Sequence, residues 1–284
     1  MALHDDDDFL YHYTTPEGLI GIVENRTLWA TDVFYLNDSE EFALGIQIAR
    51  DYMKDLIETA NGESTVGRLE WLLNEFEGIG PLRKKTVYVS SLSVEDDQLS
   101  QWRAYCRGGG FAIGFKVGRL MELARAQEFV LERCIYEPEE QRRFITRVVD
   151  SIAGPWLNSS MPWPEQPGEG PRFETHLRLV DELSRLSSIL KNQAFLEENE
   201  YRLVSEPSVL HVKGQMKFRS QRGLVVPYRE FRLDNDDLWR QVRAVVGPTP
   251  HPEQSKASVY ALLRNDRTGC AHDVRITKCS YREW

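Results

Sequence analysis

Residues 9–25 read FLYHYTTPEGLIGIVEN, and this stretch decides how the fold begins. Residues 9–14 are rich in aromatic side chains, which predicts a strand. Thr15, Pro16 and Glu17 then supply an N-cap, a proline at the first helical position and an early acid, so we expect a helix over residues 16–24. A second strand starts at residues 28–30, which indicates a mixed α and β fold.

The rest of the chain alternates between strand and helix signals. The spacing of apolar residues predicts helices near residues 39–59, 66–77, 99–105, 139–153, 173–190 and 253–265. Strands are expected at 87–92, 111–116, 129–136, 201–205, 217–219, 223–226, 228–233, 242–246 and 273–277. The proline-rich residues 154–171 are expected to form a loop or a mobile insert. We therefore expect one α+β catalytic domain over residues 9–284, with helical inserts at about 39–80 and 137–192 and a mobile acidic tail at 1–8.

Composition excludes several classes of protein. The 284 residues are 41% hydrophobic and 28% charged, which is typical of a globular chain and excludes a wholly disordered one. No apolar run reaches the roughly 20 residues of a membrane span, and the acidic N-terminus is unlike a signal peptide. Four widely spaced cysteines suit a reducing cytoplasm. The net charge of −9 disfavours a non-specific grip on nucleic acid.

Polar residues in apolar surroundings mark three candidate sites. His12 lies within a predicted strand just before two hydroxyl residues, Thr14 and Thr15, a set that can hydrogen-bond a ribose diol; a satisfied strand histidine is the alternative. Ser100, Trp102, Arg103 and Tyr105 combine an aromatic platform with a cation before three glycines, although the glycines also suit a simple turn. If the strand begins at Glu200, then Glu200 and Arg202 share one of its faces, either as a surface ion pair or as a carboxylate kept ionised by its neighbour.

A fourth stretch, residues 37–41, reads NDSEE. Asn37 and Asp38 before a helix, with acids in its first turn, are typical of helix capping. A carboxylate group for a metal ion is the alternative, but the spacing shows no further ligand.

Together these stretches resemble DUF2971, a family of uncharacterised bacterial proteins. The YHYT strand at residues 11–14, the NDxxE segment at 37–41, the SxWxxY segment at 100–105 and the ExExR segment at 198–202 carry the resemblance, which extends to residues 218–228.

The opening YHYT strand, followed by a helix and a strand, also resembles the His-Tyr-Glu type of ADP-ribosyltransferases. This resemblance implies a split, mixed or antiparallel β-sheet and an NAD-consuming activity, with NAD as substrate and no metal; a toxin or phage-defence effector would suit it. His12 would hold the adenosine-side ribose with Thr14 beside it, Tyr105 would stack on nicotinamide, and Glu200 would bind the nicotinamide ribose. Tyr13 stands where a glycine is usual, and Tyr13 or Trp102 is an alternative stacking ring. The acceptor and the oligomeric state stay open.

Two other readings compete with NAD chemistry. One is a metal-dependent nuclease or phosphodiesterase that uses His12, Asp38, Glu41 and Glu200. The other is a non-catalytic module that binds a nucleotide or a protein. Buried polar groups need partners, and either a shared site or a structural hydrogen-bond network would supply them for the polar residues in apolar surroundings: His12, Ser100, Gln101, Arg103, Glu200 and Arg202.

Overall fold

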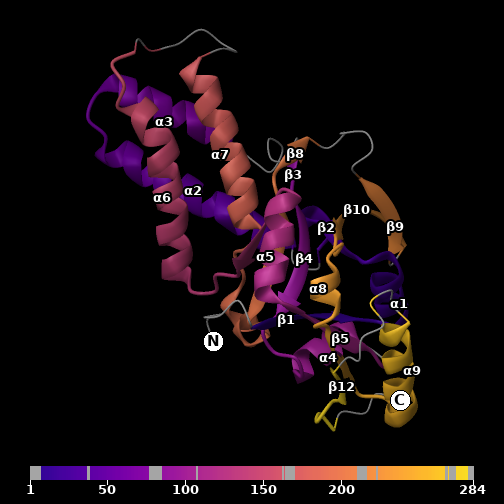
Figure 1. The fold of residues 1–284 in the computed structure, drawn as a ribbon. Coiled ribbons are helices and arrows are strands. Elements are labelled where there is room, and N and C mark those ends of the chain that lie inside the picture. Colours follow the sequence, from indigo (N-terminus) through magenta and orange to yellow (C-terminus); the bar gives the residue numbers. More distant parts are fainter. Residues whose placement is uncertain are drawn as a thin grey trace.

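The computed structural model describes residues 8–36, 39–76, 85–106, 108–161, 163, 170–209, 216–221, 223–265, 268 and 273–280, without the side chains of 39–42 and 209. Strands and helices alternate along the chain, and a bundle of long helices stands beside a twisted sheet (Figure 1). The fold is therefore of the mixed α and β class, as the sequence predicted.

The predicted strand–helix–strand unit at the start is confirmed. Strand β1 (Phe9–Thr14) leads into helix α1 (Pro16–Asn25), whose first turn is capped by the Thr15 hydroxyl, which accepts from the backbone N–H of Gly18 at 3.2 Å. Arg26 adopts a left-handed conformation with φ of 51°, which ends the helix and turns the chain into β2 (Thr27–Asp32).

Ten strands form one open, mixed sheet. The main path runs β12-β11-β5-β1-β4-β2-β10-β9, and β7 and β6 extend from β4. Only β11 and β12 pair in parallel among the described strands. The bounds are β4 (Tyr88–Ser93), β5 (Phe111–Lys116), β6 (Phe129–Arg133), β7 (Glu200–Ser205), β9 (Lys217–Gln221), β10 (Leu224–Arg232), β11 (Arg243–Val246) and β12 (Asp273–Ile276), while β3 (Lys85–Thr86) and β8 (Ser208–Val209) pair separately.

The sheet forks at β4, because one edge of this strand pairs with two others. Near its start β4 pairs with β2 at Tyr88 and Val89, and at its end it pairs with β1 at Ser93. Its other edge pairs with β7 along residues 89–93. The β1 half of the sheet and the β2 half therefore diverge beside Ser91, and this fork positions the site described below.

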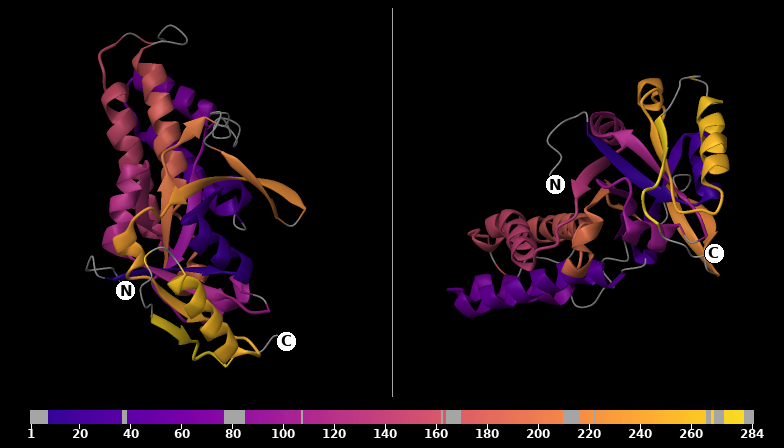
Figure 2. Two further views of the ribbon diagram at one scale, coloured as in Figure 1. Left: turned by 45° about the vertical axis from the view of Figure 1, so that its right-hand side comes forward. Right: turned by 90° about the horizontal axis from the view of Figure 1, so that it is seen from below.

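Four long helices form a lobe over one face of the sheet. They are α2 (Ser39–Thr59), α3 (Glu63–Glu75), α6 (Pro138–Leu157) and α7 (Pro171–Ser187), and they lie together beside the sheet in both views of Figure 2. Their apolar side chains form one cluster with Val89 and Val204 of the sheet. On the same face, across the fork, Tyr11 and Tyr13 pack with Trp102 of α4 (Leu99–Tyr105) in a smaller cluster.

The largest apolar cluster lies on the opposite face. It includes buried residues of β1, β5 and β7 and of four helices: α1, α5 (Val117–Ala126), α8 (Asp236–Trp239) and α9 (Pro252–Arg264). Two 3-10 segments, Val33–Tyr35 and Gln193–Glu198, complete the described elements. The fork thus lies between packed layers on both faces.

Several predicted elements and boundaries differ from the structure. Helix α6 continues through Pro155 to Leu157 instead of ending near residue 153, because Trp156 and Leu157 are buried in the lobe. Helix α5 was not predicted, since no turn residue separates it from β5. The two strands expected at 223–226 and 228–233 are one strand, β10, which carries Pro227 opposite Phe218.

None of the helices in the described part of the chain is both long enough and apolar enough to cross a bilayer.

Candidate functional site

The fork of the sheet holds the ring of His12. Between the stretches of β4 that pair with β2 and with β1, the backbone carbonyl of Ser91 lies 2.9 Å from His12 Nδ1. At this point the His12 side chain of β1, and not the backbone of a neighbouring strand, donates a hydrogen bond to β4. A carbonyl oxygen only accepts hydrogen bonds, so Nδ1 carries the proton and donates it.

This hydrogen bond fixes the chemistry of the other ring nitrogen. Burial lowers the pKa of His12, the bond to Ser91 opposes that effect, and the charge of Arg219 lowers the pKa further. The neutral ring that results, protonated at Nδ1, leaves Nε2 as a hydrogen-bond acceptor. His12 can thus accept a hydrogen bond from a ligand hydroxyl.

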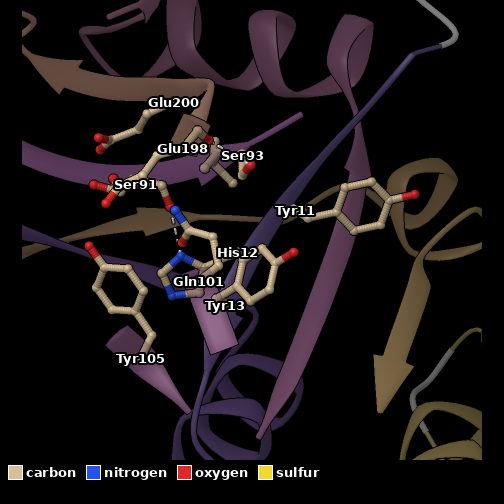
Figure 3. Close-up of a pocket in the computed structure, with 10 residues that line it drawn as sticks. Tyr11, His12, Tyr13, Ser91, Ser93, Gln101, Tyr105, Glu198 and Glu200 are labelled. Carbon is tan, nitrogen blue, oxygen red and sulfur yellow. Dashed lines mark hydrogen bonds between the residues drawn. The ribbon is translucent and has the colours of Figure 1, made fainter. Parts of the chain in front are cut away.

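A cavity of about 50 Å³ lies at the fork and brings together His12, Tyr105 and Glu200. These three residues come from β1, the last turn of α4 and the first position of β7. In Figure 3, the Tyr105 ring lies beside His12 and its hydroxyl faces the side of Glu198 and Glu200, whereas the Tyr11 ring points away. Residues far apart in sequence therefore meet at one place.

Glu200 is the centre of a buried ionic cluster. It is 4% exposed, and its carboxylate accepts from Arg202 Nε at 2.8 Å, from Arg202 Nη2 at 3.3 Å and from Lys191 Nζ. Lys191 Nζ also donates to Glu198. The two cations balance the two carboxylates, so the cluster is neutral as a whole.

The cations keep Glu200 ionised. Burial by itself would raise the pKa of this carboxyl, but the charges of Arg202 and Lys191 and their hydrogen bonds outweigh it and hold the pKa well below its usual range. Burial, together with the charges of Glu200 and Glu198, raises the pKa of Tyr105 to about 12, so its phenol stays protonated.

The cluster is arranged with its negative side toward the cavity. Glu198 and Glu200 both line the cavity, whereas Lys191 and Arg202 do not. A carboxylate offers about four lone-pair positions, and the donors from Lys191 and Arg202 occupy three of those of Glu200. One acceptor position of Glu200 is left for a ligand.

The structure places other predicted site residues outside the cavity. Trp102 is 1% exposed, donates to Asp97 at 2.8 Å and packs against Tyr13 with ring centroids 4.7 Å apart. Thr14, Ser100, Arg103 and Arg202 also do not line the cavity. Tyr13 does line it, but its hydroxyl is engaged, since it donates to the Glu95 carbonyl at 2.8 Å and accepts from Gln98 N–H at 3.0 Å. Tyr105 is therefore the ring available for stacking.

Sequence reasoning missed Lys191 and assigned no role to Gln101. Lys191 lies nine residues before Glu200, outside the ExExR motif, and only the fold brings it to the carboxylate. Gln101 is buried and lines the cavity one helical turn before Tyr105, so its place in the SxWxxY motif was the available signal.

The expected carboxylate group at residues 37–41 cannot be compared, because the side chains of Asp38 and Glu41 lie outside the described residues. Within the described part of the chain, no group of at least three His, Cys, Asp or Glu side chains is placed to hold a metal ion.

Comparison with known proteins bears out one resemblance. The family model described as "Protein of unknown function (DUF2971)" matches residues 101–203, a segment that contains Tyr105, Lys191 and Glu200 and begins after His12. None of the curated proteins and none of the solved structures compared with the chain gave a match. From α4 to β7, the chain is thus similar to the DUF2971 family.

Proposed function

We propose that this protein cleaves the bond between nicotinamide and ribose in NAD and passes ADP-ribose to an acceptor or to water. One observation carries the proposal: His12, Tyr105 and Glu200, which come from three separate elements, line one cavity. A His-Tyr-Glu set is the one implied by the resemblance to ADP-ribosyltransferases. The proposal concerns the reaction and leaves the acceptor open.

The negative lining of the cavity suits this reaction. When the bond from ribose C1′ to the pyridinium nitrogen breaks, the electron pair leaves with nicotinamide, which departs neutral, and positive charge develops on the ribose. Ionised Glu200, with one free acceptor position, can bind the ribose 2′-hydroxyl and stabilise that charge. An acceptor oxygen or nitrogen then supplies the electron pair of the new bond to C1′ and releases its proton to solvent.

His12 and Tyr105 have complementary roles. Nε2 of the neutral His12 ring accepts from a hydroxyl of the second ribose, and the Tyr105 ring stacks on the nicotinamide. A cavity of about 50 Å³ is far too small to enclose a dinucleotide, since a single water molecule already takes ~30 Å³ in the liquid. The dinucleotide therefore has to displace a side chain on entry. Tyr105, 39% exposed at the end of α4, is the one best placed to move.

Release of nicotinamide from NAD tests the proposal. Purified wild-type protein is compared with Glu200→Gln and with Glu197→Gln, a matched control at an exposed residue of the same segment that does not line the cavity. We expect release by wild type and by Glu197→Gln, and a ~10²–10³-fold loss for Glu200→Gln, which is the usual effect of removing one preorganised charge. The assay is run with and without cell lysate, and transferred label is split by protease and nuclease to identify the acceptor.

A second variant protects the test against loss of folding. Tyr105→Ala changes a side chain that is 39% exposed and outside the ionic cluster, so we expect this variant to fold while stacking is lost. Circular dichroism and thermal melting monitor both variants. Equal nicotinamide release by wild type and a folded Glu200→Gln protein, or no release by wild type under any condition, would overturn the proposal.

A further inference from the structure

Arg219 of β9 is a half-buried cation that no carboxylate of the described residues balances. Its Nη2 donates to the Thr31 hydroxyl at 2.8 Å, and its guanidinium lies 5.5 Å from the ring centroid of Trp29. Its Nε is buried and has no acceptor within the described part of the chain. A buried donor without an acceptor costs free energy, so such an atom calls for an explanation.

The neighbouring cation on the same strand shows the contrast. Lys217, two residues before Arg219 and therefore on the same face of β9, is exposed and donates to Glu230 at 2.6 Å. The hairpin of β9 and β10 thus supplies a carboxylate for its exposed cation and none for its half-buried one. General surface charge does not account for this difference.

Arg219 lies on the same face of the sheet as Glu200. Residues directly opposite one another in paired strands share a face, as do residues two apart on a strand. The register that connects them runs Arg219↔Val226, then Tyr228↔Thr31, Thr31↔Val89 and Val89↔Val204, with Glu200 four residues before Val204 on β7. Arg219 is also close enough to the fork for its charge to lower the pKa of His12.

An anion at Arg219 would complete this arrangement. A guanidinium presents its N–H groups in a planar fork that matches two oxygens of a phosphate, and a nearby hydroxyl adds a further donor. Such an anion would engage the N–H groups of the guanidinium that do not donate to Thr31. We assign the anion as phosphate because NAD, the substrate proposed above, carries a diphosphate between its two riboses.

We propose that Arg219, with the Thr31 hydroxyl, binds a phosphate group of the dinucleotide whose ribose lies at His12. The assignment rests on the function proposed above, since it takes NAD as the ligand. Arg219 would then be a positioning residue on the β2 half of the sheet, across the fork from the ionic cluster around Glu200 and on the same face.

Binding and kinetics of matched variants test this site. Titration calorimetry with ADP-ribose, inorganic pyrophosphate and adenosine is carried out on wild type, Arg219→Gln, Arg219→Lys and the control Lys217→Gln, each checked for folding by circular dichroism. Loss of a charge-assisted hydrogen bond predicts about 10- to 100-fold weaker binding of ADP-ribose and pyrophosphate by Arg219→Gln. Arg219→Lys should recover part of this affinity, Lys217→Gln should match wild type, and adenosine binding should be the same in all four proteins. For NAD cleavage, Arg219→Gln should raise KM by a similar factor with kcat little changed.

The outcomes separate this site from the reaction. If wild type binds pyrophosphate through Arg219 but releases no nicotinamide, the phosphate site stands and the proposed reaction fails. If wild type releases nicotinamide while folded Arg219→Gln keeps the KM for NAD and the affinity for pyrophosphate, the phosphate site is overturned and the reaction stands. Equal weakening by Arg219→Gln and Lys217→Gln would also overturn the site, because it would reflect surface charge alone.

Discussion

Replacing Glu200 by glutamine should make the protein less stable in a way that depends on pH. The pKa of this carboxyl falls from the ordinary 4.5 to about 2 in the folded protein. Because one pKa unit corresponds to about 1.4 kcal/mol, ionised Glu200 contributes about 3 kcal/mol to the free energy of unfolding at neutral pH. A neutral amide keeps the shape of the side chain but forfeits the attraction to Arg202 and Lys191.

The direction of the pH effect follows from the lowered pKa. The contribution of Glu200 is complete above pH 4.5, where the unfolded chain also ionises this carboxyl, and it is lost as the pH falls through about 2. The difference in stability between wild type and Glu200→Gln should therefore be about 3 kcal/mol at pH 7 and should shrink steadily below pH 4.5. All other carboxylates are common to both proteins, so their titration largely cancels in the difference.

Urea unfolding followed by tryptophan fluorescence at pH 7, 5, 4 and 3 measures this effect. With a slope of about 3 kcal/mol per molar urea, the midpoint at pH 7 should fall by about 1 M. Glu122→Gln is the control, because Glu122 forms an exposed ion pair with Arg119 at 2.8 Å, and such pairs contribute about 0–1 kcal/mol. A Glu200→Gln protein no less stable than Glu122→Gln at pH 7, or a difference that stays constant down to pH 3, would refute the reasoning.

Three further predictions follow from single contacts. Tyr13→Phe leaves the N–H of Gln98 and the carbonyl of Glu95 without their partner, so the free energy of unfolding should fall by about 1–3 kcal/mol in urea titrations; a smaller loss would mean that water replaces the hydroxyl. Burial raises the pKa of Cys106 to about 12, so peptide mapping should show no alkylation of this thiol at pH 8 until the protein unfolds. Because the pKa of His12 is lowered in the folded protein, the unfolded state binds more protons below pH 6.5, and the free energy of unfolding should fall as the pH drops from 7.5 to 5.5. In the same urea titrations, His12→Gln should show a weaker dependence on pH.

Local patterns were enough for most of the elements that carry the site. The cap at Thr15 and the aromatic run before it located β1 and α1, and the alternation along β7 placed Glu200 and Arg202 on one face. The fork at β4 could not be predicted in this way, because it depends on which strands pair with Tyr88, Val89 and Ser93. Strand pairing over such sequence distances leaves no local signal.

The motifs of the candidate site could be predicted from the sequence, but the contacts among its side chains could not. His12, Tyr105 and Glu200 were singled out from sequence, and they meet at one cavity. Trp102 carried the same aromatic signal as Tyr105, and only its burial on the inner side of α4 separates the two. Lys191 had no signal, since a lone lysine in a polar stretch is typical of a solvated surface.

The fork also constrains how this protein can change over evolution. If β1 and β4 paired continuously past Ser91, a backbone N–H would donate to the Ser91 carbonyl and no side chain would be needed there. Such pairing would also fill the cavity. Loss of the His12 side chain would enlarge the cavity and leave the Ser91 carbonyl without its hydrogen-bond donor. Ligand preference and thermal stability therefore both depend on the His12 side chain. A substitution at His12 that improves one of them, in evolution or in design, lowers the other.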